Sequence, residues 1–509
     1  MDFYDVLAER KWTTLLHKVT YCPIDFYNQK KIDAFLDGMT SDKNASVLIY
    51  GDYDVDGAMF AKIAESAVRK LGMENIYVFR YRKRTHDLDR EAVRFCIQNK
   101  FSYFIVGDTA SSDIEVLQML VAYGIKVMVL DHHITKYGYD DFDKICVPII
   151  NTTIENEIFA KDDFKFSAGA LSFCVFDNYF RHKGLKPLLE ESAYALISLY
   201  ADCMDMSNIY NRSIYYLATD LDKQDLPSYV LHFMNEYQSL NARFIGYWYA
   251  PRINALFRSE SFDILNRYLF DNVGTNERIV LIDAINHIYE GSRKMVGVLS
   301  DLVDVDVLDH FVICNLFSAV QKYNGTFHNL QNYTGLVANK LASRYGKTAV
   351  VYCSYENNYK GSVRDPYSRS YLQMFQQLCY AGGHGAAFGF VVKPFELSSF
   401  LKRLITVDKY FHIDDVDNEP IIIDHNYSIP DEGMINDIAL YNEFSGNFLP
   451  IVFIRKQLIG NMKHTPLSYY HRYDWGEYFY VQSEFPIEFG QFMLIKPTWG
   501  PQIKLRAQI

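Results

Sequence analysis

The sequence contains no run of apolar residues long enough to cross a membrane. A membrane-spanning helix needs about 18 or more such residues, and every apolar stretch here is interrupted earlier by a charge or a turn-forming residue. The N-terminal segment MDFYDVLAERKW also lacks the basic-then-apolar order of a secretory signal. We therefore expect a cytoplasmic protein with no membrane partner.

Cysteine is scarce and scattered. The eight cysteines are far apart and none forms a C-x-x-C pair, which excludes a zinc ribbon and gives no sign of a disulfide framework. We expect them to be small buried hydrophobic residues.

Positive charge is in deficit, with 51 Lys and Arg against 62 Asp and Glu, a net charge of −11. A nucleic-acid partner usually requires a basic surface, so this balance argues against one. The argument is weak, because carboxylates that surround divalent cations count as negative in such a sum, and a local basic groove can coexist with an acidic remainder. The 40 tyrosines could stack on bases, although drift in composition explains them more simply.

The composition is that of a globular protein, with 49% hydrophobic and 22% charged residues, and 509 residues predict three or four domains. Residues 46–130 alternate short apolar runs with amphipathic stretches, which predicts βαβ units and a parallel sheet. Acidic and histidine residues directly follow three of the predicted strands. Ligands of open α/β sheets bind at the carboxyl ends of the strands, so we expect these residues to converge.

The remaining sequence predicts further domains. Helices predominate at 160–240, and 276–304 has the spacing of one long helix joining two lobes. A second α/β unit follows, and then short strands with no long helix, typical of a small β-barrel. We expect an α/β fold with these boundaries: a catalytic domain at 1–240, a substrate-contacting segment and connecting helix at 241–307, a smaller α/β domain at 308–405, and a nucleic-acid-binding barrel at 415–509.

The segment GDYDVDG places Asp52, Asp54 and Asp56 two residues apart. In an extended chain they would share one face, and such crowding is unfavourable unless cations neutralise it. A metal site follows naturally, with a calcium-like loop or an Asp-rich turn as the alternative. Oxygen ligands favour magnesium or manganese, and an imidazole among them favours manganese.

Two adjacent histidines after an Asp, at the end of an apolar strand, are difficult to explain by packing. In the segment DHH, His132 could bind metal, Asp131 could orient an imidazole, and His133 could hydrogen-bond a substrate oxygen. Asp202 is less informative by itself, because an Asp at the end of an apolar helix is usually a cap or a surface residue.

Four segments resemble, in order and spacing, the motifs of the DHH phosphoesterase superfamily: GDYDVDG, VGDTASSD, VLDHH and ALISLYADCMDM. Four more resemble the family of the single-strand-specific exonuclease RecJ, which includes bacteriophage members: APRINALFR, KGSVRD, the DHHA1-domain signature GGHGAAFGF, and YNEFSGNFLPIVF, which is similar to the start of the RecJ OB-fold. The resemblance covers nearly the whole chain.

The resemblance implies a role for particular residues. It assigns the ligands of two divalent cations, Mn²⁺ or Mg²⁺, to Asp54, Asp56, Asp108, His132 and Asp202, with Asp108 bridging. It places His133 on the scissile phosphate with Asp131 as its catalytic partner, and it implies in-line attack of water on phosphorus. It assigns substrate binding to Asn254, Arg258, Ser362, Arg364 and His384, with Arg258, Ser362 and Arg364 on the terminal 5′ phosphate. Asp52 and the basic residues Arg82 and Arg84 of RYRKR are further candidates; a solvated charged loop is the alternative for RYRKR.

The sequence also departs from the family pattern. Tyr50 stands where many members have a His four residues before the first ligand Asp, and Phe257 replaces a glycine of the P-R-x-N-A-x-G-R segment. The acidic ligands are kept, whereas residues that shape the substrate channel differ.

The resemblance implies a metal-dependent exonuclease that degrades single-stranded DNA from the 5′ end and releases mononucleotides. RNA is the alternative substrate, and a single-strand-binding protein or a helicase is a candidate partner. Two other functions stay open. One is a DHH phosphodiesterase of short oligonucleotides or cyclic dinucleotides, which the C-terminal residues 415–509 disfavour; the other is a catalytically silent replication scaffold, which the retained carboxylates disfavour.

Overall fold

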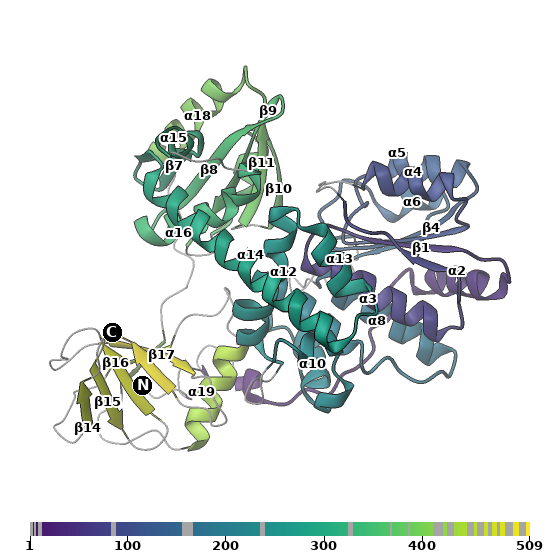
Figure 1. Cartoon of the computed structure of the whole chain (residues 1–509), viewed down its shortest axis with the longest axis horizontal. Helices are drawn as coiled ribbons and strands as arrows, with labels where there is room; N and C mark the ends of the chain where they lie inside the picture. The colour runs from purple at the N-terminus through teal and green to yellow at the C-terminus, as the bar shows by residue number, and fades with distance from the viewer. Residues whose placement is uncertain are drawn as a thin grey trace.

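The computed structural model contains two α/β lobes, a helical region between them and a C-terminal sheet (Figure 1). It describes residues 4, 7, 8, 13–82, 88–154, 166–234, 240–323, 329–366, 369–384, 387–410, 421–424, 432–444, 452–455, 463–466, 471–475, 479–483, 492–497 and 505–508. For residues 384, 410, 432, 434, 435, 439 and 442, and for the strands beyond residue 420, it describes the backbone only.

The first lobe is built on a five-stranded sheet in which every pairing is parallel, as the sequence predicts. Its strands, in the order β2-β1-β3-β4-β5, are Ile76–Val78, Val47–Gly51, Tyr103–Gly107, Lys126–Asp131 and Ile149–Asn151. The chain leaves β1 for β2 on one side and then returns to β3 on the other. This reversal opens a crevice at the carboxyl ends of β1 and β3, where open α/β sheets bind ligands.

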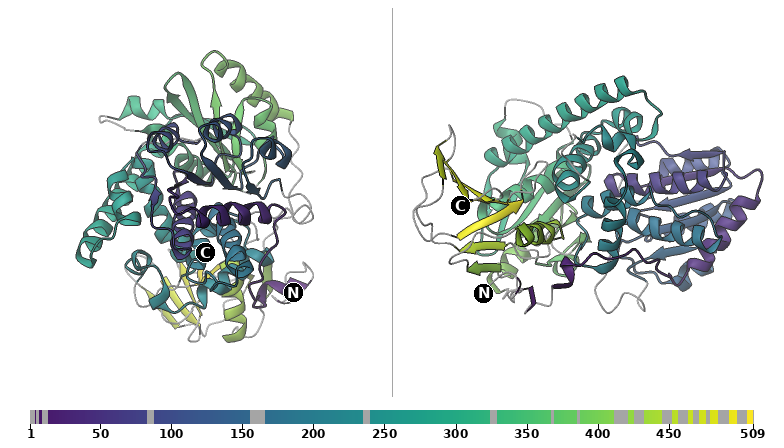
Figure 2. Two further views of the ribbon diagram at one scale, coloured as in Figure 1. Left: turned by 90° about the vertical axis from the view of Figure 1, so that its right-hand side faces the viewer. Right: turned by 90° about the horizontal axis from the view of Figure 1, so that it is seen from below.

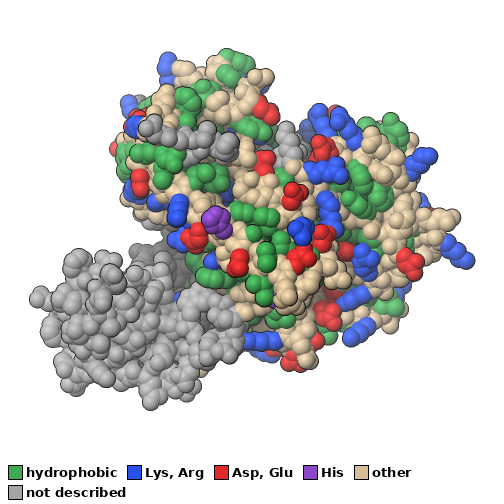
Figure 3. Space-filling model, in the orientation of Figure 1, with side chains coloured by type: hydrophobic (Ala, Val, Ile, Leu, Met, Phe, Trp, Pro, Cys, Tyr) green, Lys and Arg blue, Asp and Glu red, His purple; other side chains and the backbone are tan. Residues whose placement is uncertain are grey.

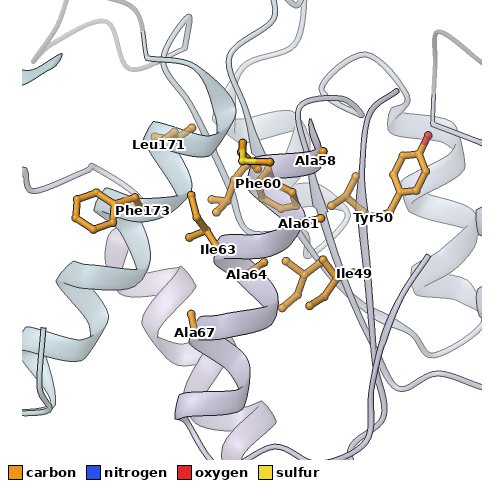
Figure 4. Packing of buried hydrophobic residues seen from close by; sticks show 14 of the residues in the cluster. Ile49, Tyr50, Ala58, Phe60, Ala61, Ile63, Ala64, Ala67, Leu171 and Phe173 are labelled. Atoms are coloured by element: carbon orange, nitrogen blue, oxygen red, sulfur yellow. The ribbon is translucent and has the colours of Figure 1, made fainter. Parts of the chain in front are cut away.

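Helices cover both faces of this sheet (Figure 1). On one face lie α4 (Arg90–Gln98), α5 (Ile114–Ala122) and α6 (Tyr139–Lys144), and on the other lie α2 (Gln29–Ser41), α3 (Val55–Lys70) and α8 (Ala168–His182). Figure 4 shows how closely α3 packs: Ala58, Ala61 and Ala64 face β1, from which Ile49 points toward the helix and the Tyr50 ring points away, while Leu171 and Phe173 of α8 lie on the other side of α3. These side chains are buried, and their small size on α3 brings the helix close to the sheet.

A helical region follows the sheet. It comprises α9 (Ser192–Ala201), α10 (Ile209–Thr219), η2 (Lys223–Asp225), α11 (Ser228–Leu231), η3 (Phe244–Tyr249), α12 (Ala250–Ser259), α13 (Phe262–Phe270) and α14 (Thr275–Leu302), and a short helix, η1 (Thr13–Leu16), precedes the sheet. The long helix predicted at 276–304 is α14, which lies along one side of the molecule between the lobes (Figures 1 and 2).

The second lobe has a six-stranded mixed sheet, ordered β10-β11-β9-β8-β7-β6, in which only β7 and β8 are parallel. Its strands are β6 (Val305–Val307), β7 (Phe311–Asn315), β8 (Thr348–Tyr355), β9 (Asn358–Arg364), β10 (Tyr380–His384) and β11 (Ala387–Val392). Its helices are α15 (Phe317–Lys322), η4 (Leu330–Tyr333), α16 (Thr334–Tyr345), α17 (Leu372–Gln376) and α18 (Leu397–Tyr410). The smaller α/β unit predicted for this region is confirmed.

The C-terminal region contains seven short strands in one sheet, ordered β12-β13-β17-β18-β16-β15-β14. They are Ile421–Asp424, Val452–Arg455, Phe492–Pro497, Leu505–Gln508, Phe479–Ser483, His471–Trp475 and Lys463–Pro466. The short strands agree with the prediction, whereas their closure into a barrel stays a prediction. The expectation of no long helix is wrong, because this region contains the 13-residue helix α19 (Glu432–Phe444), whose Phe444 packs against Tyr215 and Tyr216 of α10.

Two further expectations meet the structure. All eight cysteines are free thiols, but Cys22, Cys146 and Cys203 are exposed, so the expectation of uniform burial is wrong. No helix of the described chain is both long and apolar enough to cross a membrane. Figure 3 shows one face of the molecule, on which acidic and basic side chains are interspersed.

Candidate metal and phosphate site

The loop GDYDVDG connects β1 to α3 through a backbone contact that only glycine permits. A Cβ at Gly51 would lie 1.9 Å from the carbonyl oxygen of Gly57, and a Cβ at Gly57 would lie 2.3 Å from the backbone nitrogen of Asp52. Asp54 caps α3 by accepting the N–H of Gly57 at 3.0 Å, and Asp56 lies in the first helical turn. The extended conformation is present at Asp54 but ends there, because α3 begins at Val55 and places Asp56 in a helical turn.

Asp56 is held by the N-terminus of α8. Its carboxylate accepts the backbone N–H of Ala168 at 2.7 Å and that of Gly169 at 2.8 Å, and it accepts the Ser198 hydroxyl. A Cβ at Gly169 would lie 2.5 Å from the Ser198 hydroxyl, so glycine is needed for this approach. Burial, together with the Asp202 and Asp54 carboxylates, raises the pKa of Asp56 well above its usual range.

Asp108 directly follows β3 and is buried with a backbone φ of +62°. Ala110, two residues later, has φ +81°. Non-glycine residues adopt this left-handed region at a cost, and such strain concentrates at functional sites. Burial and the nearby carboxylates of Asp56 and Asp54 raise the pKa of Asp108 well above its usual range.

The histidine pair at the end of β4 is divided between two tasks. Asp131 accepts N–H groups from the backbone of Ser111 and His132, and it accepts Nδ1–H of His133 at 2.8 Å. Burial alone would raise the pKa of Asp131, but the His133 imidazole and these hydrogen bonds hold it below its usual range. Burial would likewise lower the pKa of His133, but Asp131 raises it to about 10. Asp131 therefore orients a half-exposed, positively charged His133.

His132 is buried at the centre of the carboxylates. Its Nε2 lies 3.1 Å from Oδ1 of Asp108, 3.6 Å from Oδ2 of Asp56 and 3.6 Å from Oδ2 of Asp202, which ends α9. His132 belongs to two groups of side chains with metal-ligand spacing. The first group also contains Asp108 and His133, and the second also contains Asp56 and Asp202. These groups fit a divalent cation, because they combine hard oxygens with an imidazole and burial leaves the carboxylates crowded.

Asp54 lies at the same edge but outside both groups. It hydrogen-bonds to Asp108, and its pKa is raised by burial and by Asp202. Asp52 is half-buried in the same loop, and its charge also raises the pKa of Asp108. The structure thus gathers all the predicted acidic residues and both histidines at one sheet edge.

A buried guanidinium, that of Arg364, lies in the second lobe beside the N-terminus of α16. Ser362 and Arg364 are on β9, and the Ser362 hydroxyl lies 2.9 Å from that of Thr334. A Cβ at Gly335 would lie 2.9 Å from Nη2 of Arg364. Burial lowers the pKa of Arg364, whereas the nearby Cys203, which follows Asp202, raises it. Arg364 therefore lies near the sheet edge of the first lobe that carries the predicted metal ligands, which we call the metal edge.

The other predicted substrate residues are less defined. Arg258 is on α12, where its carbonyl accepts Nδ2–H of Asn332 at 3.0 Å beside the start of α16; Asn254 lies one turn earlier. His384 ends β10, where it pairs with Ala387, and Ala387 in turn pairs with Arg364, so its backbone is two strands from that arginine. Gly383 has φ +135°, as its glycine permits.

The basic segment RYRKR is not a uniform phosphate surface. Arg80 donates to Asp271 at 2.8 Å, and Arg82 is exposed with its guanidinium 5.7 Å from the centre of the Phe79 ring. Arg84 lies outside the described residues.

Sequence reasoning missed the groups that support the site. Ser198 and the α8 residues that hold Asp56 are more than 100 positions from it in sequence, and Thr334 and Gly335 precede Ser362 by 27 or 28. Ser167, which caps α8, was the one available local signal.

Comparisons with known proteins agree with this geometry. Residues 46–201 match the model of the DHH family, N-terminal domain. RecJ of Bacillus subtilis, described as a single-stranded-DNA-specific exonuclease, is 24% identical over 424 residues; the match covers 77% of this chain and 51% of that protein, so this chain spans about half its length.

The fold is similar to that of RecJ from Thermus thermophilus. The structure in complex with Mn²⁺ has a TM-score of 0.74 at 16% identity, covering 99% of this chain and 74% of that one. The structure with Mg²⁺ has a TM-score of 0.67 at 15% identity, covering 99% and 73%. Residues 46–201 are therefore similar to the N-terminal domain of the DHH family, and the chain as a whole is similar to RecJ in sequence and in fold.

Proposed function

We propose that the protein is a metal-dependent exonuclease that hydrolyses single-stranded DNA from its 5′ end. The observation that carries this proposal is the convergence of His132 with three carboxylates at the sheet crevice. Arg364 of the second lobe supports it from the other side, as a cation suited to a terminal phosphate.

Asp54, Asp56, Asp108, His132 and Asp202 would hold two divalent cations, Mn²⁺ or Mg²⁺. Such ions, when bound, lower the pKa of water and stabilise the charge that develops on the phosphoryl oxygens. Their charge would also relieve the mutual repulsion of the buried carboxylates, which is the strongest sign that this site requires cations.

His133 would donate a hydrogen bond to a non-bridging oxygen of the scissile phosphate. Its Nδ1 donates to Asp131, the carboxylate raises the pKa of the ring, and Nε2 would be the atom that donates to substrate. Asp131 is thus a positioning residue.

The pocket of Arg364, Ser362 and the α16 N-terminus would hold the terminal 5′ phosphate. Guanidinium N–H groups, a hydroxyl and helix N–H groups all donate to phosphate oxygens. Holding the strand end at a fixed place relative to the metal edge would set the bond that is cut, so that mononucleotides would be released.

The test uses the full chain with Mn²⁺ or Mg²⁺ and single strands labelled at the 5′ or the 3′ end, with matched duplex and RNA strands. Early release of labelled mononucleotide from the 5′ label alone supports the proposal. Early release from the 3′ label would overturn the proposed 5′-to-3′ direction, and a preference for RNA would overturn the proposed DNA substrate. Hydrolysis of di- and trinucleotides only would favour a small-substrate phosphodiesterase.

A further inference from the structure

A cavity lies where α3, α9, α11, α13 and α14 meet, away from the metal edge. Its volume is about 270 Å³, and its lining includes Lys62, Tyr194, Ser228, Phe270 and Arg278. None of these residues belongs to the proposed metal or 5′-phosphate sites.

Arg278 is a buried charge without an opposite charge. Its side chain is on the first turn of α14 and the residue is 7% exposed. Nη2 donates one hydrogen bond, to the carbonyl of Val273 at 3.3 Å, and within the described chain no carboxylate lies at ion-pair distance from its guanidinium. A guanidinium has five N–H donors, and burying it without an opposite charge is unfavourable.

The other charges around the cavity are already balanced. Lys62 pairs with Glu65 at 3.1 Å, and Asp271 pairs with Arg80 at 2.8 Å. Arg278 is therefore the one charge on this lining that a ligand would have to neutralise, and the ligand must be an anion.

We propose that this cavity binds the phosphate group of a small anion, either inorganic phosphate or a mononucleotide. The guanidinium of Arg278 matches two phosphate oxygens, and the ammonium of Lys62 and the hydroxyl of Ser228 are further donors on the same lining. The volume accommodates a phosphate with a sugar, not a strand of nucleic acid.

The cavity shares two helices with the metal edge. Lys62 is on α3, which begins at the aspartates of GDYDVDG, and Tyr194 is on α9, which ends at Asp202. A bound anion would link both helices to α14. The site itself requires no metal, so it can be tested independently of the proposed nuclease activity.

The experiment is a calorimetric titration of metal-free Arg364→Gln protein in EDTA with inorganic phosphate, and separately with 5′-dAMP. The Arg364→Gln background removes phosphate binding at the proposed 5′-end pocket. We expect saturable binding of at least one of the two ligands, and adding Arg278→Gln should weaken it at least about tenfold. Arg293→Gln is the matched control on the same helix, because Arg293 is 65% exposed and remote from the cavity lining; it should leave binding unchanged.

Two measurements keep the test decisive. Circular dichroism tests whether Arg278→Gln is folded. If that variant does not fold, Lys62→Gln takes its place and should weaken binding severalfold. Equal affinities for parent and both variants, or no saturable binding of either ligand by the parent, would overturn the proposal. Binding of a 5′-hydroxyl oligonucleotide that depends on Arg278, without phosphate binding, would also overturn it and assign the surface to a strand backbone.

Discussion

The two α/β lobes present opposite charges from different kinds of sheet. In the first lobe, carboxylates follow the ends of parallel strands and meet at a crevice, where burial and crowding raise the pKa values of Asp56 and Asp108. In the second lobe, Ser362 and Arg364 lie along an inner antiparallel strand, and burial lowers the pKa of Arg364. We interpret this difference as complementarity to the two ligands proposed above, cations in the first lobe and a phosphate in the second.

The largest effect should come from removing charge at the first lobe. Asp108→Asn keeps a residue type that tolerates φ +62° but removes one carboxylate, so hydrolysis should fall to background. The metal-free variant should unfold at the same temperature as the parent or higher, because a repelling charge is lost. Asp140→Asn, at an exposed position on α6, is the control. Comparable hydrolysis by Asp108→Asn and parent at saturating Mn²⁺ would remove Asp108 from the site.

The second lobe is tested by Arg364→Gln. Loss of a charge-assisted contact should weaken binding of 5′-phosphorylated strands about tenfold or more, as measured by fluorescence anisotropy without metal. Strands with a 5′ hydroxyl never make this contact and serve as the control. Equal loss for both kinds of strand would mean that Arg364 does not recognise the end.

Glu443, outside the metal edge, tests whether burial raises a carboxyl pKa where no other carboxylates crowd it. Glu443 of α19 accepts the backbone N–H of Ala242 and the Tyr200 hydroxyl, and burial raises its pKa to about 7 despite the opposing influence of Arg243. Because the pKa is raised in the folded state, the stability that Glu443 contributes is complete below its ordinary pKa of 4.5 and is lost as pH rises through about 7.

The free energy of unfolding should therefore fall by about 1 kcal/mol more between pH 6 and pH 8 in the parent than in Glu443→Gln. Urea denaturation at the two pH values measures this difference, with Glu190→Gln, at an exposed glutamate, as the control. Parallel pH dependence in parent and Glu443→Gln would show that Glu443 titrates normally, and that burial without crowding does not raise a carboxyl pKa here.

The smallest effect is expected at Tyr50. Its ring is buried against Phe79 and Tyr53, close to the GDYDVDG loop. Tyr50→His should lower the Mn²⁺ concentration needed for half-maximal hydrolysis by a fewfold, because an imidazole adds a nitrogen ligand. Tyr50→Phe is the control for packing. An unchanged metal titration would identify Tyr50 as a core residue only.

The sequence predicted the elements whose signals are local. Apolar runs followed by acidic residues located β1, β3 and β4 and the crevice at their ends, and helical spacing at 276–304 predicted α14 nearly to its ends. The segment of α19 also has helical spacing, with Ile438 and Tyr441 buried three residues apart. This helix could therefore have been predicted from the sequence. The segment GDYDVDG carries a comparable local signal, because Asp54 before a short polar turn is an N-cap pattern that predicts a helix start before Asp56.

Long-range contacts could not be predicted in this way. The groups that hold Asp56 come from α8 and α9, and the partner of Ser362 comes from α16. No periodicity or spacing in one sequence relates positions so far apart.

The most direct test of the central claim is a titration of metal-free protein with Mn²⁺, followed by electron paramagnetic resonance of the free ion. The account predicts saturable binding by the parent that Asp108→Asn and His132→Ala weaken strongly and Asp140→Asn leaves unchanged. Binding of equal affinity in all four proteins, or no binding by the parent, would contradict the claim that these buried carboxylates and His132 form a metal site.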